Sequence, residues 1–101
     1  MKAKEYFEKY GEAIWQEAHE PEVRIDGAMA KMLIDFTSEM SGIIKARNIK
    51  TDQGLFGLIE ELNVKWNAVV NLFTKKHGAS PIRRDGFKIA IKKELGIISE
   101  G

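Results

Sequence analysis

The sequence contains no cysteine and only two prolines, and no stretch of it is apolar for more than a few residues. The lack of cysteine excludes disulfide bonds, thiol catalysis and zinc sites built on cysteine. Apolar runs as short as Met32-Leu33-Ile34 are far below the length that crosses a bilayer, so we expect no membrane partner. The chain opens on charged residues without an apolar signal segment, and we therefore expect a cytoplasmic protein.

The residues that are present fit one small folded domain. The chain has 101 residues, of which 44% are apolar and 31% charged, the balance of a globular protein. A chain of this length has room for a single hydrophobic core. We therefore treat residues 1–101 as one domain.

The charges are divided unevenly along the chain, although the formal net charge is only +1. Residues 1–40 hold 5 Lys and Arg against 9 Asp and Glu, and residues 41–101 hold 11 against 6. Within the second part, segment 75–93 carries seven basic residues and one acid, Asp85. Such a block could attract phosphate groups. The arrangement that we expect instead is internal balance, with the acidic first helix beside the basic segment.

Apolar residues at spacings of three and four predict helices over about 3–19, 22–47 and 52–77. Asn48 and Gly78 suit the left-handed turns that end the second and third of these helices. The third helix is the most regular, and its apolar residues step by 4, 3, 4, 3 and 4. These residues, the apolar stripe of the third helix, are Leu55, Ile59, Leu62, Trp66, Val69 and Phe73.

The second helix carries a similar stripe, which we expect to face the core. Its residues are Ile25, Met29, Met32, Phe36, Met40 and Ile43.

The last segment can be interpreted in two ways. Ser80 as a cap and Pro81 in the first turn favour a short fourth helix over about 81–95. The alternation over residues 87–92 is also typical of a strand, but the sequence offers no convincing partner strand. We therefore predict an all-α fold in which three long antiparallel helices form an up-down-up bundle and a short C-terminal fourth helix packs against it.

Little in the sequence argues for catalysis or for a cofactor. Glu8, Glu12 and His19 share a helical surface and are residue types that bind metals, which makes metal-dependent hydrolysis a third and weak hypothesis. A solvated helix face explains the same pattern more simply. His77 lies near a helix C-terminus, where a charged imidazole would interact favourably with the helix dipole. We expect no cofactor and no metal site, and the protein is more simply interpreted as a non-enzyme.

Three features indicate surfaces that could contact a partner. Trp15 lies away from the apolar centre of the first helix, and tryptophan is enriched at interface hot spots; the alternative is that the fourth segment covers it. Ile34 projects from the polar side of the second helix. Asn63, Asn67 and Asn71 form a row at every fourth residue of the third helix, where they could hydrogen-bond a partner or form an ordinary polar face.

These features favour a non-catalytic helical interaction module, with a regulatory or structural accessory role, that binds a protein partner or a second copy of itself as a homodimer. Trp15, Ile34 and the asparagine row are its candidate contact residues. The second hypothesis is non-specific nucleic-acid binding through segment 75–93. Its candidate residues are Lys75, Lys76, Arg83, Arg84, Lys88, Lys92 and Lys93.

Overall fold

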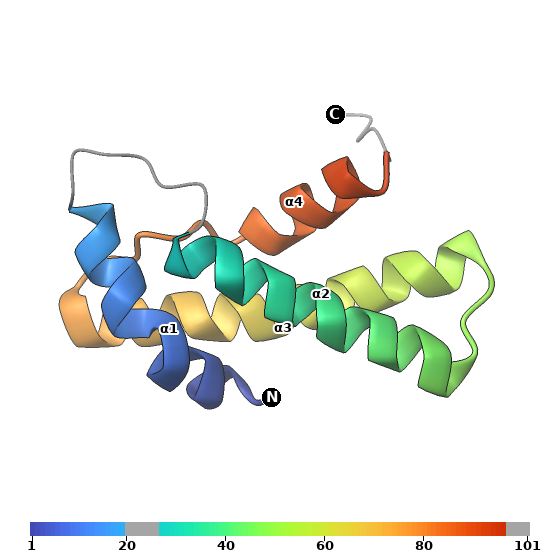
Figure 1. The fold of residues 1–101 in the computed structure, drawn as a ribbon, viewed down its shortest axis with the longest axis horizontal. Coiled ribbons are helices and arrows are strands. Elements are labelled where there is room, and N and C mark those ends of the chain that lie inside the picture. The colour runs from blue at the N-terminus through green and yellow to red at the C-terminus, as the bar shows by residue number, and fades with distance from the viewer. Residues whose placement is uncertain (20–26, 97–101) are drawn as a thin grey trace.

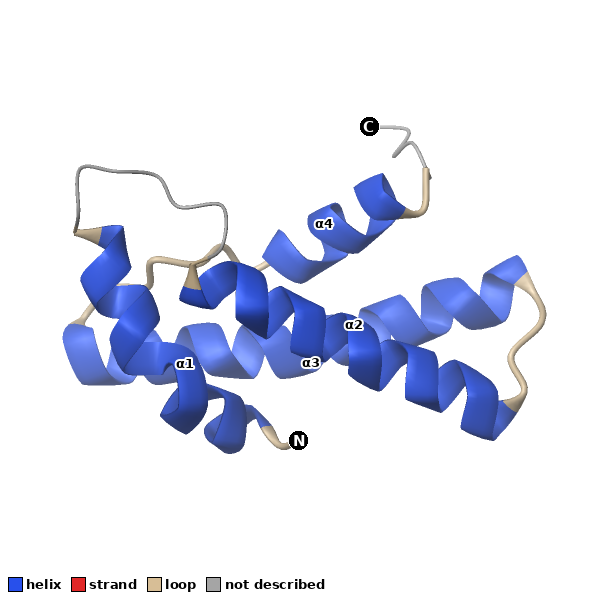
Figure 2. Ribbon diagram, viewed as in Figure 1, coloured by secondary structure: helices blue, strands red, loops and turns tan. Residues whose placement is uncertain are grey.

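The computed structural model describes residues 1–19 and 27–96, which form four helices. In chain order these are α1 (Ala3–Ala18), α2 (Ala28–Arg47), α3 (Asp52–His77) and α4 (Gly86–Glu94), shown in Figure 1. The described residues contain no strand (Figure 2), so the predicted all-α fold of three long helices and a short fourth one is confirmed. None of these four helices combines the length and the apolar content that crossing a bilayer requires.

The longest helices, α2 and α3, form an antiparallel hairpin along the length of the molecule (Figure 1). Asn48 ends α2 with a left-handed φ of 55°, and the N–H of Ile49 donates to the carbonyl of Ile44 at 3.0 Å. The side chain of Thr51 then accepts a hydrogen bond from the N–H of Gly54 at 3.0 Å and caps α3. Local residues therefore set the hairpin turn, and the left-handed ends predicted at Asn48 and Gly78 are confirmed.

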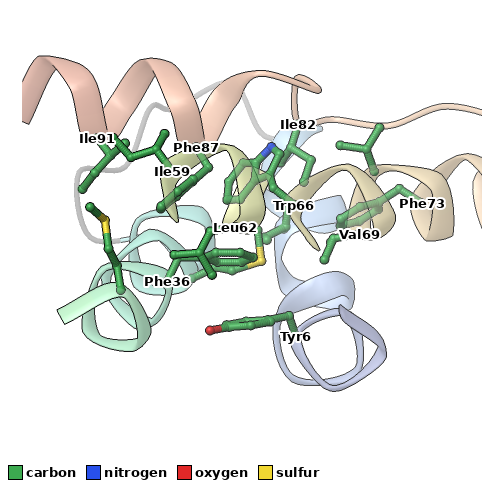
Figure 3. Close-up of a cluster of buried hydrophobic side chains, with 14 of the residues drawn as sticks. Tyr6, Phe36, Ile59, Leu62, Trp66, Val69, Phe73, Ile82, Phe87 and Ile91 are labelled. Carbon is green, nitrogen blue, oxygen red and sulfur yellow. The ribbon is translucent and has the colours of Figure 1, made fainter. Parts of the chain in front are cut away.

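The apolar stripe of α3 faces inward along one continuous helix, as predicted (Figure 3). Five of its six side chains are 2% exposed or less, and Leu55, in the first turn, is half-buried. The bounds of α3 match the predicted range of 52–77. This helix is therefore the central rod of the core.

The other helices meet α3 around the ring of Phe36 on α2. Tyr6 from α1 stacks on Phe36 with ring centroids 4.2 Å apart. Trp66 from α3 and Phe87 from α4 lie 5.3 Å and 5.2 Å from the same ring. All four rings are buried, so one aromatic cluster joins the four helices (Figure 3).

The fourth helix begins later than predicted. It starts at Gly86 rather than at Pro81, and Ser80 does not cap it: the Ser80 hydroxyl accepts a hydrogen bond from the N–H of Ile82 at 3.2 Å. Ile82 is buried, and the indole N–H of Trp66 donates to the carbonyl of Arg83 at 2.6 Å. The burial of Ile82 and the hydrogen bond from Trp66 to Arg83 hold the backbone before Gly86 in a non-helical conformation. The alternative of a strand over 87–92 is wrong, because those residues are helical.

The start of the second helix also differs from the prediction. Helix α2 begins at Ala28 and is preceded by Gly27 in an extended conformation, with ψ at 176°. The predicted residues 22–26, which include Ile25, lie outside the described part of the chain. Met29 was expected in the core but is 45% exposed, because the first turn of α2 buries Ala28 instead.

A half-buried ion pair joins the middle of α2 to α3. Glu39 accepts hydrogen bonds from the ammonium group of Lys65 at 2.8 Å and from the amino group of Met1 at 2.7 Å. Partial burial acts to raise the pKa of Glu39, but these two donors outweigh it and hold the pKa below its usual value. On the preceding turn of α2, Asp35 accepts a hydrogen bond from the Tyr10 hydroxyl, which is the main cause of the lowered pKa of Asp35.

The apolar stripe of α3 can be tested by paired truncations. We expect Leu62→Ala, which empties a buried position, to lower the free energy of unfolding by about 2–5 kcal/mol. Val64→Ala, two residues along at a 69% exposed position, should change it by about 0.5 kcal/mol or less. Urea denaturation followed by circular dichroism measures both values. Equal losses in the two variants would contradict the inward orientation of the stripe.

The ion pair at Glu39 gives a pH dependence of a definite sign. Because its folded pKa is lowered, Glu39 stabilises the fold above its unfolded pKa, near 4.5, and this stabilisation is lost as the pH falls through the folded pKa. We expect Glu39→Gln to be less stable than the wild type at pH 7 and to lose less further stability between pH 5 and pH 3. Thermal melting across this range tests the prediction. An unchanged acid slope in the variant would contradict it.

Candidate functional site

Trp15, the first candidate contact residue, packs against the core rather than projecting freely from α1. It is half-buried, and its indole stacks on the imidazole of His77 at 3.9 Å with the planes 7° apart. His19 approaches the same indole at 4.5 Å and donates from Nδ1 to the carbonyl of Trp15. The ring that covers it is therefore that of His77 at the end of α3, and helix α4 does not contribute, since α1 and α4 do not contact each other. His77 thus has a packing role that its position in the sequence did not indicate.

The asparagine row lies partly within the bundle. Asn63 and Asn67 are half-buried on α3, and the amide oxygen of each is buried without a hydrogen-bond donor among the described residues. Only Asn71 of the three is exposed. The amide oxygens of two of the three residues are therefore withdrawn from any partner in this structure.

The basic residues of segment 75–93 are spread over the end of α3, the following turn and α4. Three of them have acidic neighbours: Lys76 reaches Glu12 at 3.8 Å, Arg83 reaches Asp85 at 3.9 Å, and Lys88 pairs with Glu60. The expected balance between the acidic first helix and this segment is thus found at one point only, between Lys76 and Glu12. The segment does not form a single stripe on one helix.

Ile34 lies at the edge of a groove between α2 and α4. Its side chain is 62% exposed, and it borders a hollow of about 370 Å³. A second hollow of about 320 Å³ adjoins the first, because Thr37 and Ile91 line both. We call the two hollows together the α2–α4 groove.

The surface of the α2–α4 groove is mainly apolar. Its apolar side chains come from α2, from the α2–α3 turn and start of α3, and from the C-terminal part of the chain. They are Leu33, Ile34, Met40, Ile44, Ile49, Leu55, Phe87, Ala90, Ile91 and Leu95. Along α2 the edge carries the short hydroxyl side chains of Thr37, Ser38 and Ser41, and a few charges complete the lining.

The groove exists because of where α4 is anchored. Phe87 and Ile91 bury the start and middle of α4 against the core, while Leu95 at its end is 46% exposed. In Figure 1, α4 runs in the same direction as α2 but rises away from the α2–α3 hairpin toward its C-terminal end. Helix α1 packs at the end of the α2–α3 hairpin that is farther from the turn. The described helices therefore cover the turn end of the hairpin incompletely, and Ile44 and Ile49 remain half-buried there.

Of the residues that line this groove, only Ile34 was predicted from the sequence as a contact residue. Met40 and Leu55, which also line it, were expected in the apolar stripes of the second and third helices. One feature of the sequence could have indicated the groove, namely the width of the apolar face of α2. Leu33 and Ile44 make this face wider than one neighbouring helix covers.

Metal-binding residue types do not cluster in the described part of the chain. No three histidine, aspartate or glutamate side chains among residues 1–19 and 27–96 come together in a way that could hold a metal ion. Glu12 is instead engaged with Gln16 and Lys76, and His19 with Trp15. No observation in this region therefore supports metal-dependent hydrolysis.

Comparison with known proteins adds no relative: the chain matches no family model, no curated protein and no solved structure.

The stack of Trp15 on His77 can be measured by a double-mutant cycle. We expect Trp15→Ala to cost about 1–3 kcal/mol of folding stability, since the side chain is half-buried against the core. With His77→Ala as the second change, the coupling energy should be about 0.5–1.5 kcal/mol, the range of aromatic pairs. A coupling near zero would show that the two rings do not stabilise each other in solution.

Proposed function

We propose that the protein is a non-catalytic helical interaction module that binds a partner protein through the α2–α4 groove. The observation that supports this most directly is the groove itself, an open and mainly apolar depression bordered by the exposed side chains of Ile34 and Leu95. Exposed apolar surface that is contiguous and rimmed by polar residues is typical of protein interaction sites.

The chemistry of the groove favours binding over catalysis. Its charged lining residues are Lys50, Asp52 and Glu94, and its hydroxyls are those of threonine and serine on α2 and in the turn. Neither histidine lines it, and the hydroxyls of Thr37 and Thr51 hydrogen-bond to backbone groups rather than to the lining carboxylates of Asp52 and Glu94. An apolar helix face is the ligand that such a surface accommodates.

Non-specific nucleic-acid binding remains the second hypothesis, with less support. Its basic residues lie on three separate segments, and three of the seven have an acidic neighbour. Phosphate binding needs several free cations along one path. The groove therefore gives the stronger basis for a function.

The proposal is tested with a displayed library of random 16-residue helical peptides, selected against the full chain. We expect enriched peptides to carry apolar residues at i, i+3 or i+4, and i+7. Ser41→Trp, which places a large ring into the groove from an exposed position, should weaken their binding about tenfold or more.

The matched control is Asn71→Trp, which adds the same ring at an exposed position on α3 outside the groove. It should bind the peptides as the wild type does, and both variants should keep the wild-type melting temperature. Peptides that bind Ser41→Trp as tightly as the wild type, or a selection without enrichment, would contradict the proposal. Loss of binding in Asn71→Trp alone would move the site to the asparagine row.

A further inference from the structure

We infer that the α2–α4 groove receives an amphipathic helix of another protein, about three turns long and with acidic residues on its flanks. This inference rests on the proposed function and specifies the partner. Three properties carry it: the length of the groove, the charge along its edges and the faces that the chain's own helices present.

The length and shape of the groove suit a short helix. Its wall on α2 extends from Leu33 to Ile44, about 16 Å at 1.5 Å per residue, which equals about three helical turns. The short side chains of Ser38 and Ser41 at the edge allow a second backbone to approach closely. A helix placed there would also cover the half-buried Ile44 and Ile49 at the open end of the hairpin.

The edges of the groove carry more positive than negative charge. Lys50 lines the groove. Three further exposed lysines lie beside it, because each is three or four residues from a lining residue on the same helix. They are Lys31, near Ile34, Lys45, near Ser41, and Lys93, near Ala90. Asp52 and Glu94 oppose them. None of the four lysines forms an ion pair with another residue of the described chain. Acidic flanks on the ligand complement this excess.

The described helices offer no second apolar face that would fit the groove of a neighbouring copy. Outside the groove, the exposed large apolar side chains of the described helices are Met29, Phe56, Val64 and Ile89. No two of these lie three or four residues apart, so they do not form a helical stripe. Among the described helices, a second copy could supply only its own groove face, and that pairing would bring the lysines of both copies together. The occupant is therefore the helix of a different protein.

The experiment uses two synthetic 14-residue helices with the same apolar stripe, one with glutamate flanks and one with lysine flanks. Each is titrated into the full chain by calorimetry, and the contacted residues are mapped by amide chemical shifts. We expect the acidic peptide to bind about tenfold more tightly at low salt and to shift the amides of Thr37, Ser41 and Ile91. The difference should shrink as salt is added.

Charge reversal gives the matched variants. Lys45→Glu with Lys93→Glu should remove the preference for the acidic peptide. Lys4→Glu with Lys75→Glu makes the same change in net charge at exposed positions away from the groove, and should leave the preference largely intact.

The outcomes separate this inference from the proposed function. Equal or tighter binding of the basic peptide at the groove would overturn the acidic flanks and leave the groove as a binding site. Absence of any shift at the groove with both peptides would count against the proposed function itself. A dimer of the chain alone, detected by sedimentation and abolished by Ser41→Trp, would show that the groove is used between copies and would overturn a foreign partner.

Discussion

The arrangement of the four helices depends on the packing of one aromatic ring, that of Phe36. Tyr6, Trp66 and Phe87, each from a different helix, have ring centroids 4.2–5.3 Å from it. Trp66 extends this cluster into the connection before α4 through its hydrogen bond to the carbonyl of Arg83. A side chain that contacts all the other helices fixes their mutual positions more strictly than separate pairwise contacts do.

This central anchor also explains why the molecule has an open groove. Helix α4 is held at its start by Phe87 and by the buried Ile82 just before it, and it is only nine residues long. It is too short to cover the whole of α2, about 30 Å long at 1.5 Å per residue. The apolar side chains of α2 beyond α4 are consequently not fully covered by the described helices. The groove that supports the proposed function is therefore a consequence of how the core is built.

Periodicity in the sequence was sufficient to predict α3, because a stripe such as Ile59, Leu62 and Trp66 has only one inward orientation on a helix. Local turn chemistry likewise predicted the ends at Asn48 and Gly78. The start of α4 was not predictable from local signals, since the buried Ile82 and the hydrogen bond from Trp66 overrode the capping signal of Ser80. The hydrogen bond joins residues 17 positions apart, and the local helix propensity of a sequence does not encode a tertiary contact of this kind.

The candidate site was predictable only in part for the same reason. Ile34 was identified because it interrupts a polar face, whereas the remainder of the groove depends on the angle between α2 and α4. Trp15 was recognised as unusual for its place on α1, but its neighbour His77 is 62 residues away in sequence. Pairings of this kind follow from the packing of the helices and not from the spacing of residues along one of them.

The most direct test of this account is a nuclear Overhauser experiment on the chain with Phe36 as the observed ring. The account predicts cross-peaks from Phe36 to the rings of Tyr6, Trp66 and Phe87 in the same sample, since all three ring centroids lie within 5.3 Å of it. A Phe36 ring that shows no cross-peaks to one or more of these partners would contradict the joining of four helices at a single cluster, and with it the origin of the groove.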